Sequence, residues 1–222
     1  EQPIPTAKLP HFQDGFVSVQ DASAQLAALI LSPKPGMTVL DACAAPGGKA
    51  CHLAELGATV TATDISKDRL VKVDENANRL NVSINSILSD GRSLHEVLAS
   101  ASFDAILLDV PCSATGVMRR NPDVKVIRRK SDINQFATLQ SELLQSVWTL
   151  LKPGGRLLYA TCSLLLQEND SIIGTFLTAD TTACSLPLPQ EVGETTTYGQ
   201  QVIPSASGGD GLYYSLLGKT TL

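Results

Sequence analysis

The stretch MTVLDACAAPGGK, residues 37–49, decides the fold class. Its first half, residues 37–43, is an apolar run typical of a buried strand, and a turn containing two glycines follows directly. A helix should then continue to about Leu56. Small residues in such a turn let the backbone approach a ligand closely. Because ligands of open α/β sheets bind at the carboxyl ends of the strands, we expect a binding site at this turn.

The strand–turn–helix pattern repeats along the chain. Helices are predicted after a capping Ser66, with apolar residues at helical spacing, and from about Asp132 to the KPGG sequence at 152–155. Further strands are predicted at residues 58–64, 85–90, 103–109 and 156–162. Strands that alternate with helices predict an α/β fold, with a mainly parallel sheet and helices on both faces.

The two ends of the chain follow other patterns. Residues 1–35 should form an N-terminal extension and an apolar helix, with Ser18 and Asp21 as capping-box partners. Residues 178–201 are rich in Thr and Pro and predict mostly loop, followed by an alternating strand within residues 208–219. We expect one domain over residues 1–222. Because the sequence does not begin with Met, we also expect it to be a fragment of a longer chain.

Composition sets the protein class. The chain is 43% hydrophobic and 18% charged, which is typical of a globular protein, and its net charge is −5. No apolar run approaches the ~20 residues that span a bilayer, so we expect no membrane partner. The five cysteines are odd in number and widely spaced, which favours reduced thiols over a disulfide framework and therefore a cytoplasmic location. The three histidines lack metal-ligand spacing, so we expect no metal.

Carboxylates follow three of the predicted strands. The turn matches neither G-x-G-x-x-G nor G-x-x-x-x-G-K-[ST], so neither the dinucleotide nor the triphosphate pattern is present. Asp64 is placed to accept hydrogen bonds from ribose hydroxyls, Asp90 from an adenine amino group, and Asp109 lies near the reactive end of the ligand. A positively charged sulfonium suits such a ring of carboxylates, which predicts S-adenosylmethionine. A plain tight turn with helix-capping acids is the structural alternative.

Two cysteines also follow predicted strands. Cys112 lies in LLDVPCSATG, residues 107–116, and Cys162 lies in YATCSLLLQEND, residues 159–170. If the fourth and fifth strands are neighbours, their carboxyl ends bring both thiols to the crevice that holds Asp109. A thiolate there would be a nucleophile, but position alone leaves open which thiol attacks. The remaining cysteines are expected to act as small buried hydrophobic residues, and they are Cys43, Cys51 and Cys184.

The run RRNPDVKVIRRK, residues 119–130, contains six basic residues and one acid. It follows the Cys112 segment, so it should line the mouth of the same crevice. There it could bind the phosphates of a nucleic acid, with a solvated loop as the alternative. The residues assigned to this contact are Arg119, Arg120, Lys125, Arg128, Arg129 and Lys130.

Four motifs together resemble the RNA 5-methylcytosine methyltransferases, especially the bacterial 16S rRNA cytosine-C5 enzymes of the Sun/Fmu type. They are DACAAPGGK, DGR, ILLDVPCSATGVMRRNPD and YATCSLLLQEND. The resemblance implies a Rossmann-like, S-adenosylmethionine-dependent methyltransferase with a C-terminal antiparallel strand. It implies that the cofactor is bound by Cys43, Ala44, Ala45, Pro46, Gly47, Gly48, Lys49, Asp64, Asp90 and Asp109.

The same resemblance implies that Cys162 is the nucleophile, which adds to carbon 6 of a cytosine so that carbon 5 can be methylated. We assign product release to Cys112 and a hydrogen bond with the cytosine ring to Asp109. DNA cytosine methyltransferases use a Pro-Cys nucleophile, which would instead point to Cys112. The expected partner is RNA, most simply 16S rRNA, and we expect a monomer.

Alternatives within and outside this family remain. The RNA could be a tRNA. Methylation of an exocyclic amino group is disfavoured because DVPCS, residues 109–113, lacks the aromatic residue of a D/N-P-P-Y loop, and a non-catalytic RNA-binding module is disfavoured by the two cysteines and the acids. The chain departs from the family in two respects: it shows no counterpart of the usual N-terminal helical RNA-binding domain, and it has Val126 where Trp is usual.

Overall fold

The computed structural model describes residues 4–189, 192–205 and 208–221. The strands of this part of the chain are β1 Thr38–Asp41, β2 Thr59–Asp64, β3 Ile84–Leu88, β4 Phe103–Asp109, β5 Leu151–Thr161, β6 Ala183–Leu186, β7 Glu194–Thr195, β8 Gln200–Val202 and β9 Leu212–Lys219. They form one sheet in the order β3-β2-β1-β4-β5-β9-β8-β7, and β6 also pairs with β9. The first five strands are parallel and the others antiparallel, which confirms the predicted sheet.

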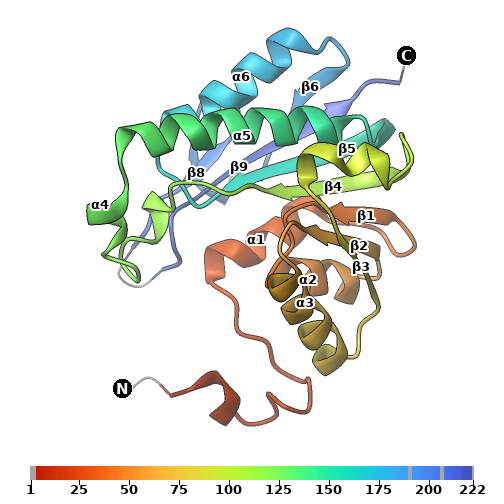
Figure 1. Cartoon of the computed structure of the whole chain (residues 1–222), viewed down its shortest axis with the longest axis vertical. Helices are drawn as coiled ribbons and strands as arrows, with labels where there is room; N and C mark the ends of the chain where they lie inside the picture. Colours follow the sequence, from red (N-terminus) through yellow and green to blue (C-terminus); the bar gives the residue numbers. More distant parts are fainter. Residues whose placement is uncertain (1–3, 190–191, 206–207, 222) are drawn as a thin grey trace.

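Helices cover both faces of the sheet, as predicted (Figure 1). One face carries α1 Ala22–Leu31, α2 Gly48–Glu55 and α3 Lys67–Leu80, and the other carries α5 Lys130–Trp148 and α6 Asp170–Ala179. The short elements are α4 Val124–Ile127 and the 3-10 turns η1 Thr6–Lys8, η2 Gly91–Glu96, η3 Thr115–Val117 and η4 Leu166–Glu168. Within the described residues, no helix combines the length and apolar character needed to span a membrane.

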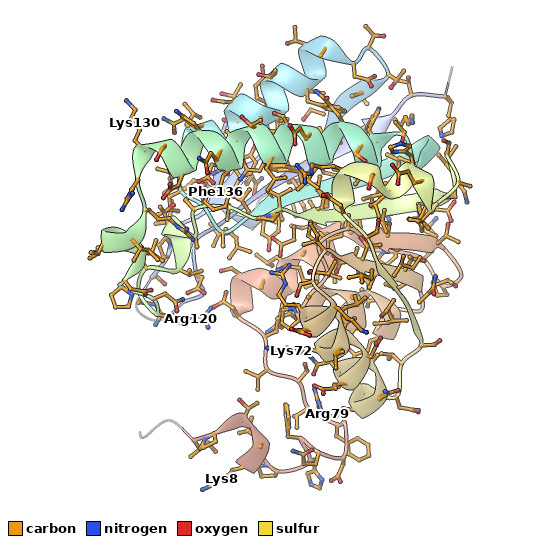
Figure 2. The ribbon with its side chains drawn as sticks, viewed as in Figure 1. Lys8, Lys72, Arg79, Arg120, Lys130 and Phe136 are labelled. Carbon is orange, nitrogen blue, oxygen red and sulfur yellow. The ribbon has the colours of Figure 1, made fainter. Side chains whose placement is uncertain are left out.

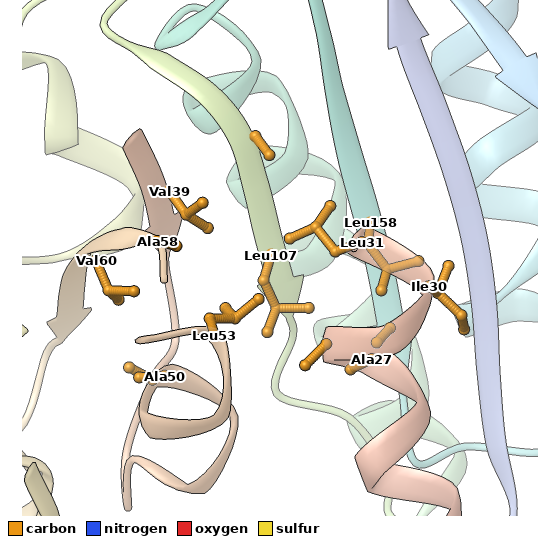
Figure 3. Close-up of a cluster of buried hydrophobic side chains, with 14 of the residues drawn as sticks. Ala27, Ile30, Leu31, Val39, Ala50, Leu53, Ala58, Val60, Leu107 and Leu158 are labelled. Atoms are coloured by element: carbon orange, nitrogen blue, oxygen red, sulfur yellow. The ribbon is translucent and has the colours of Figure 1, made fainter. Parts of the chain in front are cut away.

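Two apolar clusters hold these layers together. Successive residues of a strand point to opposite faces, so Leu107 joins the cluster beneath α1–α3 while Leu108 joins the cluster beneath α5 and α6. Figure 3 shows the first cluster, in which Leu107 and Leu158 of the sheet meet Leu53 of α2 and Leu31 of α1. The continuous apolar runs of the central strands follow from this burial on both sides.

The C-terminal region is mostly loop over residues 178–201, as predicted, but it also contains short strands that were not predicted. Strands β6, β7 and β8 lie there, apart from residues 190–191, which are outside the described part. Strands β6 and β8 form beside β9, which is buried along residues 212–218. The predicted alternation of buried and exposed residues in β9 is therefore wrong. One edge of β9 pairs with β5, and β6 and β8 pair with its other edge, so its backbone polar groups are satisfied.

Two helix boundaries also differ from the prediction. The KPGG sequence does not end α5, which stops at Trp148; it lies inside β5, beside an irregular register with β4. At α1 the capping residue is Asp21, which accepts a hydrogen bond from the Ser23 backbone at 2.9 Å, and Ser18 takes no part. Residues before α1 pass along α3, where Arg79 donates to the carbonyls of Phe12 and Val17 (Figure 2).

Candidate active site

The turn between β1 and α2 is closed tightly onto α3. Gly47 has φ +100°, and a Cβ there would lie 2.9 Å from the Cα of Val73, so the turn requires glycine at this position. The Gly47 amide donates to the carbonyl of Ala44 at 2.7 Å, and the Cys51 amide donates to the carbonyl of Gly47 at 2.8 Å. The predicted cofactor turn, residues 43–49, therefore joins the end of β1 to the start of a helix, as the sequence indicated.

A cavity of about 570 Å³ opens beside this turn, within the 300–1,000 Å³ usual for small-molecule sites. Of the predicted cofactor residues, Cys43, Asp64 and Asp90 line it, whereas residues 44–49 and Asp109 do not. Its other wall is the first half of α5, which the sequence analysis did not assign to the site. That wall consists of Asn134, Gln135, Thr138, Leu139, Glu142 and Leu143.

Arginines bind both acids of the cavity. The Arg69 guanidinium contacts both carboxylate oxygens of Asp64, the closer at 2.6 Å. Arg92 contacts Asp90 at 2.6 Å, and these hydrogen bonds lower the pKa of Asp90. Both arginine side chains are about half exposed, at 53% and 50%. Asp90 lies two residues beyond β3 and caps η2, so it does not end the strand as predicted.

Asp41, the last residue of β1, is the most unusual acid of the site. Its side chain is buried, and neither carboxylate oxygen has a hydrogen-bond partner within the described residues. Burial raises the pKa of Asp41 to about 7, and the negative charge of Asp109 contributes. A buried carboxylate without a partner is costly, so Asp41 indicates a place for a cationic ligand group. Asp41 and Asp64 each end a strand, so the sequence could have identified Asp41 as a site residue by the pattern that identified Asp64.

Lys49 and Asp109 form the ion pair between the turn and the thiols. Lys49 Nζ lies 2.6 Å from Asp109 Oδ2. Burial alone would lower the pKa of Lys49, but the Asp109 carboxylate raises it above the ordinary value. Lys49 therefore neutralises Asp109.

The structure brings Cys112 and Cys162 together. Strands β4 and β5 are parallel neighbours, with Asp109 in register with Ala160, and the two Sγ atoms lie 3.3 Å apart as free thiols. The hydrogen bond from Cys112 lowers the pKa of Cys162, and the positive charge of Lys49 contributes. The same bond and burial raise the pKa of Cys112. Cys162 is the more exposed of the two, so it is the thiol that ionises first.

Each of these cysteines precedes a serine, and both serines bind Glu168. The Oγ atoms of Ser113 and Ser163 each lie 2.5 Å from Glu168 Oε2, and Ser113 N and Gln140 Nε2 donate to Oε1 at 2.8 and 3.1 Å. All four residues are fully buried. The sequence analysis missed this network, although its signals were visible: two Cys-Ser dipeptides and an acid six residues after Cys162.

The basic run does not form one surface. Arg120 forms an ion pair with Asp210, whose side chain is 1% exposed, and Arg119 lies 3.9 Å from the same carboxylate. Arg128 donates to the carbonyl of Ser113 at 2.8 Å. Arg119 and Arg120 provide donors for the buried carboxylate of Asp210, and Arg128 provides a donor for the carbonyl of Ser113. These contacts fix the loop that contains Cys112.

The remaining basic residues of the run are exposed. Lys125, Arg129 and Lys130 form no ion pair within the described part of the chain. Figure 2 shows Lys130 pointing away from the start of α5, at the same end of the molecule as Arg120. These three side chains are therefore available to an anionic partner, as is the partly exposed Arg119, whose contact with Asp210 is long at 3.9 Å.

The other cysteines differ from one another. Burial raises the pKa of both Cys43 and Cys51, the latter to about 11, so both fit the expected inert role. Cys184 contradicts that expectation, because it is exposed on the short strand β6. Among the described residues, no group of three or more His, Cys, Asp or Glu side chains is arranged to hold a metal ion.

Comparison with known proteins identifies the family. The family model described as "16S rRNA methyltransferase RsmB/F" matches residues 28–218. This chain belongs to that family. It is 48% identical to ribosomal RNA small subunit methyltransferase B of Cronobacter sakazakii, over 99% of this chain and 51% of that protein. The chain thus spans about half the length of the curated relatives it matches.

Solved structures share the fold seen here. A methyltransferase homolog protein from Pyrococcus horikoshii is 30% identical, with a TM-score of 0.84, over 98% of this chain and 73% of that one. NSun6 from Pyrococcus horikoshii with SFG is 28% identical, with a TM-score of 0.88, over 99% of this chain and 57% of that one. Membership of the RsmB/F family confirms the resemblance inferred from the four sequence motifs.

Proposed function

We propose that this RsmB/F family chain methylates carbon 5 of a cytosine in RNA, with 16S rRNA as the substrate and S-adenosylmethionine as the methyl donor. The observation that carries the proposal is the pair of thiols 3.3 Å apart at the ends of β4 and β5. The names of the curated relatives support an rRNA substrate. The thiols and the cavity come from one chain, so a monomer suffices.

The cavity fits S-adenosylmethionine. Asp64 and Asp90 line it, and their carboxylates can accept hydrogen bonds from ribose hydroxyls and an adenine amino group. Asp41 does not line the cavity, but it directly precedes two of the lining residues, and its buried carboxylate lacks a partner. The ammonium group of the methionine part would satisfy Asp41. When bound, S-adenosylmethionine supplies an electrophilic methyl group on a positively charged sulfur. Arg69 and Arg92 are half exposed, so they can give way to a ligand at the acids.

Cys162 is the nucleophile in this proposal. Its thiolate forms a bond to carbon 6 of the cytosine, which shifts electron density to carbon 5 and makes that carbon nucleophilic. The hydrogen bond from Cys112 and the positive charge of Lys49 favour the thiolate. Asp109, held by Lys49, accepts a hydrogen bond from the cytosine amino group and so orients the ring.

Cys112 serves product release. After carbon 5 has gained its methyl group, the proton on carbon 5 must leave and the bond between Cys162 Sγ and carbon 6 must break, which returns the thiolate. Cys112 Sγ lies 3.3 Å from Cys162 Sγ, close enough to assist this proton transfer. Its burial suits a group that acts on the adduct rather than one that attacks an incoming base.

The exposed residues Lys125, Arg129 and Lys130 are the proposed contacts with RNA phosphates. Arg119, Arg120 and Arg128 instead position the loop. The target cytosine must leave its stack to reach Cys162. We place the reaction in the cytoplasm, because two thiols at this separation would readily form a disulfide in an oxidising compartment.

The test is a covalent adduct with RNA that contains 5-fluorocytosine, because fluorine on carbon 5 blocks release. With S-adenosylmethionine present, the wild-type chain should give a protein–RNA adduct on a denaturing gel, and Cys162→Ser should give none. Cys112→Ala should accumulate adduct even with ordinary RNA. If Cys162→Ser still formed adduct and Cys112→Ser did not, the assignment of the nucleophile would be wrong.

A further inference from the structure

The two Cys-Ser dipeptides are bound to a single buried carboxylate. The two carboxylate oxygens of Glu168 receive four hydrogen bonds, two each. Two of these donors are the hydroxyls of Ser113 and Ser163, which directly follow Cys112 and Cys162. The carboxylate therefore ties the chain segments after β4 and β5 to each other immediately beside the thiols.

The bonds leave the two segments little freedom. Ser113 and Ser163 are each 0% exposed, and each hydroxyl proton is directed at Glu168 Oε2, so the two Oγ atoms come within 3.1 Å of each other. Ser113 also donates its backbone amide to Oε1, which fixes the peptide that follows Cys112. Gln140 of α5 donates to the same oxygen and anchors Glu168 to the helix layer.

We infer that Glu168 is a positioning residue that sets the separation of Cys112 and Cys162. Charge-assisted hydrogen bonds are about twice as strong as neutral ones, so one carboxylate can hold two loops in a fixed relation. Without it, two buried serine hydroxyls and one backbone amide would lose their acceptor, and the loops would move to find others. The Sγ–Sγ contact of 3.3 Å would then open.

Opening of the contact between Cys112 Sγ and Cys162 Sγ would change how the two thiols share a proton. At the present Sγ–Sγ distance of 3.3 Å either thiol can donate to the other. When Cys162 is the thiolate, the Cys112 S–H stabilises it and keeps the proton nearby. This consequence for turnover rests on the proposed function, whereas the effect on the thiols can be measured without RNA or cofactor.

The experiment compares Glu168→Gln with a control from the same segment, Asp170→Asn. Glu168→Gln keeps the shape of the side chain but removes the charge that orients both hydroxyls. Asp170 is buried and accepts from Tyr213 at 2.6 Å and from Thr196 at 2.8 Å, so Asp170→Asn weakens buried bonds of the same segment that do not involve the two Cys-Ser dipeptides. Urea denaturation shows whether the two variants lose similar stability.

The decisive measurement is the rate at which iodoacetamide alkylates Cys162 as a function of pH, followed by mass spectrometry of the peptide that holds it. In Glu168→Gln the pH midpoint of Cys162 alkylation should rise toward that of an ordinary thiol, and in Asp170→Asn this midpoint should match that of wild type. The kcat for methylation should fall about 100-fold in Glu168→Gln, with KM for S-adenosylmethionine unchanged. Glu168→Asp, which restores the charge, should recover part of both effects.

An alkylation profile of Glu168→Gln that matches wild type would overturn the inference, whatever happens to stability. If Glu168→Gln does not fold, Ser113→Ala and Ser163→Ala remove one bond at a time, and unchanged midpoints in both would overturn it equally. A wild-type chain that forms no RNA adduct would contradict the proposed function alone, because the alkylation profile tests Glu168 independently.

Discussion

The two halves of the active site hold their functional groups in different ways. On the cofactor side, at the ends of β1–β3, carboxylates line a cavity and are bound by arginines that are half exposed. On the thiol side, at the ends of β4 and β5, the cysteines are fixed by hydrogen bonds among fully buried residues.

This difference matches the task of each half. Groups that bind a ligand must exchange one partner for another, and exposed arginines can leave at low cost because water solvates them. Two thiols that share a proton must instead keep one separation, and buried hydrogen bonds are costly to lose. Apart from Gly47, which the turn requires, the cofactor half should therefore tolerate substitutions that the thiol half does not.

The largest effect is expected where the thiol side is tightest. Gly116 donates its backbone amide to the carbonyl of Cys162 at 2.8 Å, and a Cβ on Gly116 would lie 2.0 Å from the carbonyl oxygen of Gly211. Gly116→Ala must therefore displace backbone, and it should lower the free energy of unfolding by about 3 kcal/mol, measured by urea denaturation. The adduct with RNA should be lost as well.

The matched substitution on the cofactor side is Gly48→Ala. The nearest atom to a Cβ on Gly48 is Gln20 Nε2 at 3.9 Å, and Gly48 is the first residue of α2. Alanine is a better helix former by up to ~1 kcal/mol, so stability should be unchanged or slightly higher. Equal losses in Gly48→Ala and Gly116→Ala would refute the contrast between the two halves.

A smaller effect, which depends on pH, is expected at Asp41. The folded pKa of about 7 lies above the ordinary value of 3.8, so the neutral carboxyl contributes stability that is full below about pH 4 and is lost as the pH rises through 7. Asp41→Asn cannot ionise. Its Tm should therefore lie close to that of wild type at about pH 5 and exceed it at about pH 8, by an amount that calorimetry can resolve.

Binding of S-adenosylhomocysteine provides a control for the prediction at Asp41. If Asp41 receives the cationic ammonium group, S-adenosylhomocysteine should raise the Tm of wild type at about pH 8 more than that of Asp41→Asn. A Tm difference between the two chains that stayed constant with pH would show that Asp41 is not held at a raised pKa.

The smallest effect is expected at Arg92. Its side chain is 50% exposed, and Asp90 beside it is 29% exposed, so their ion pair is largely solvated. Arg92→Ala should leave the urea midpoint of unfolding close to that of wild type, because water already solvates the ion pair, and Arg92→Lys should match wild type. Calorimetric titration should find the affinity for S-adenosylhomocysteine unchanged. A loss of stability as large as that of Gly116→Ala would show that the arginines of the cofactor side are structural.

Local patterns in the sequence determined much of this protein. The parallel strands, the turn at residues 43–49, the acids at Asp64 and Asp109, and the two cysteines at strand ends were all predictable. Each depends on a short stretch of chain whose burial and turn geometry follow from neighbouring residues. The four motifs also sufficed to indicate the family that comparison confirmed.

Only the tertiary structure decided which side chains meet. Strands β6 and β8 form in a segment predicted to be mostly loop because they pair with the edge of β9. Arg120 of the basic run forms an ion pair with the buried Asp210. Asp210 is 90 residues from Arg120, and Glu168 is 55 residues from Ser113. No local pattern carries such pairings, because a buried charge or backbone group is satisfied by whichever partner the folded chain brings to it.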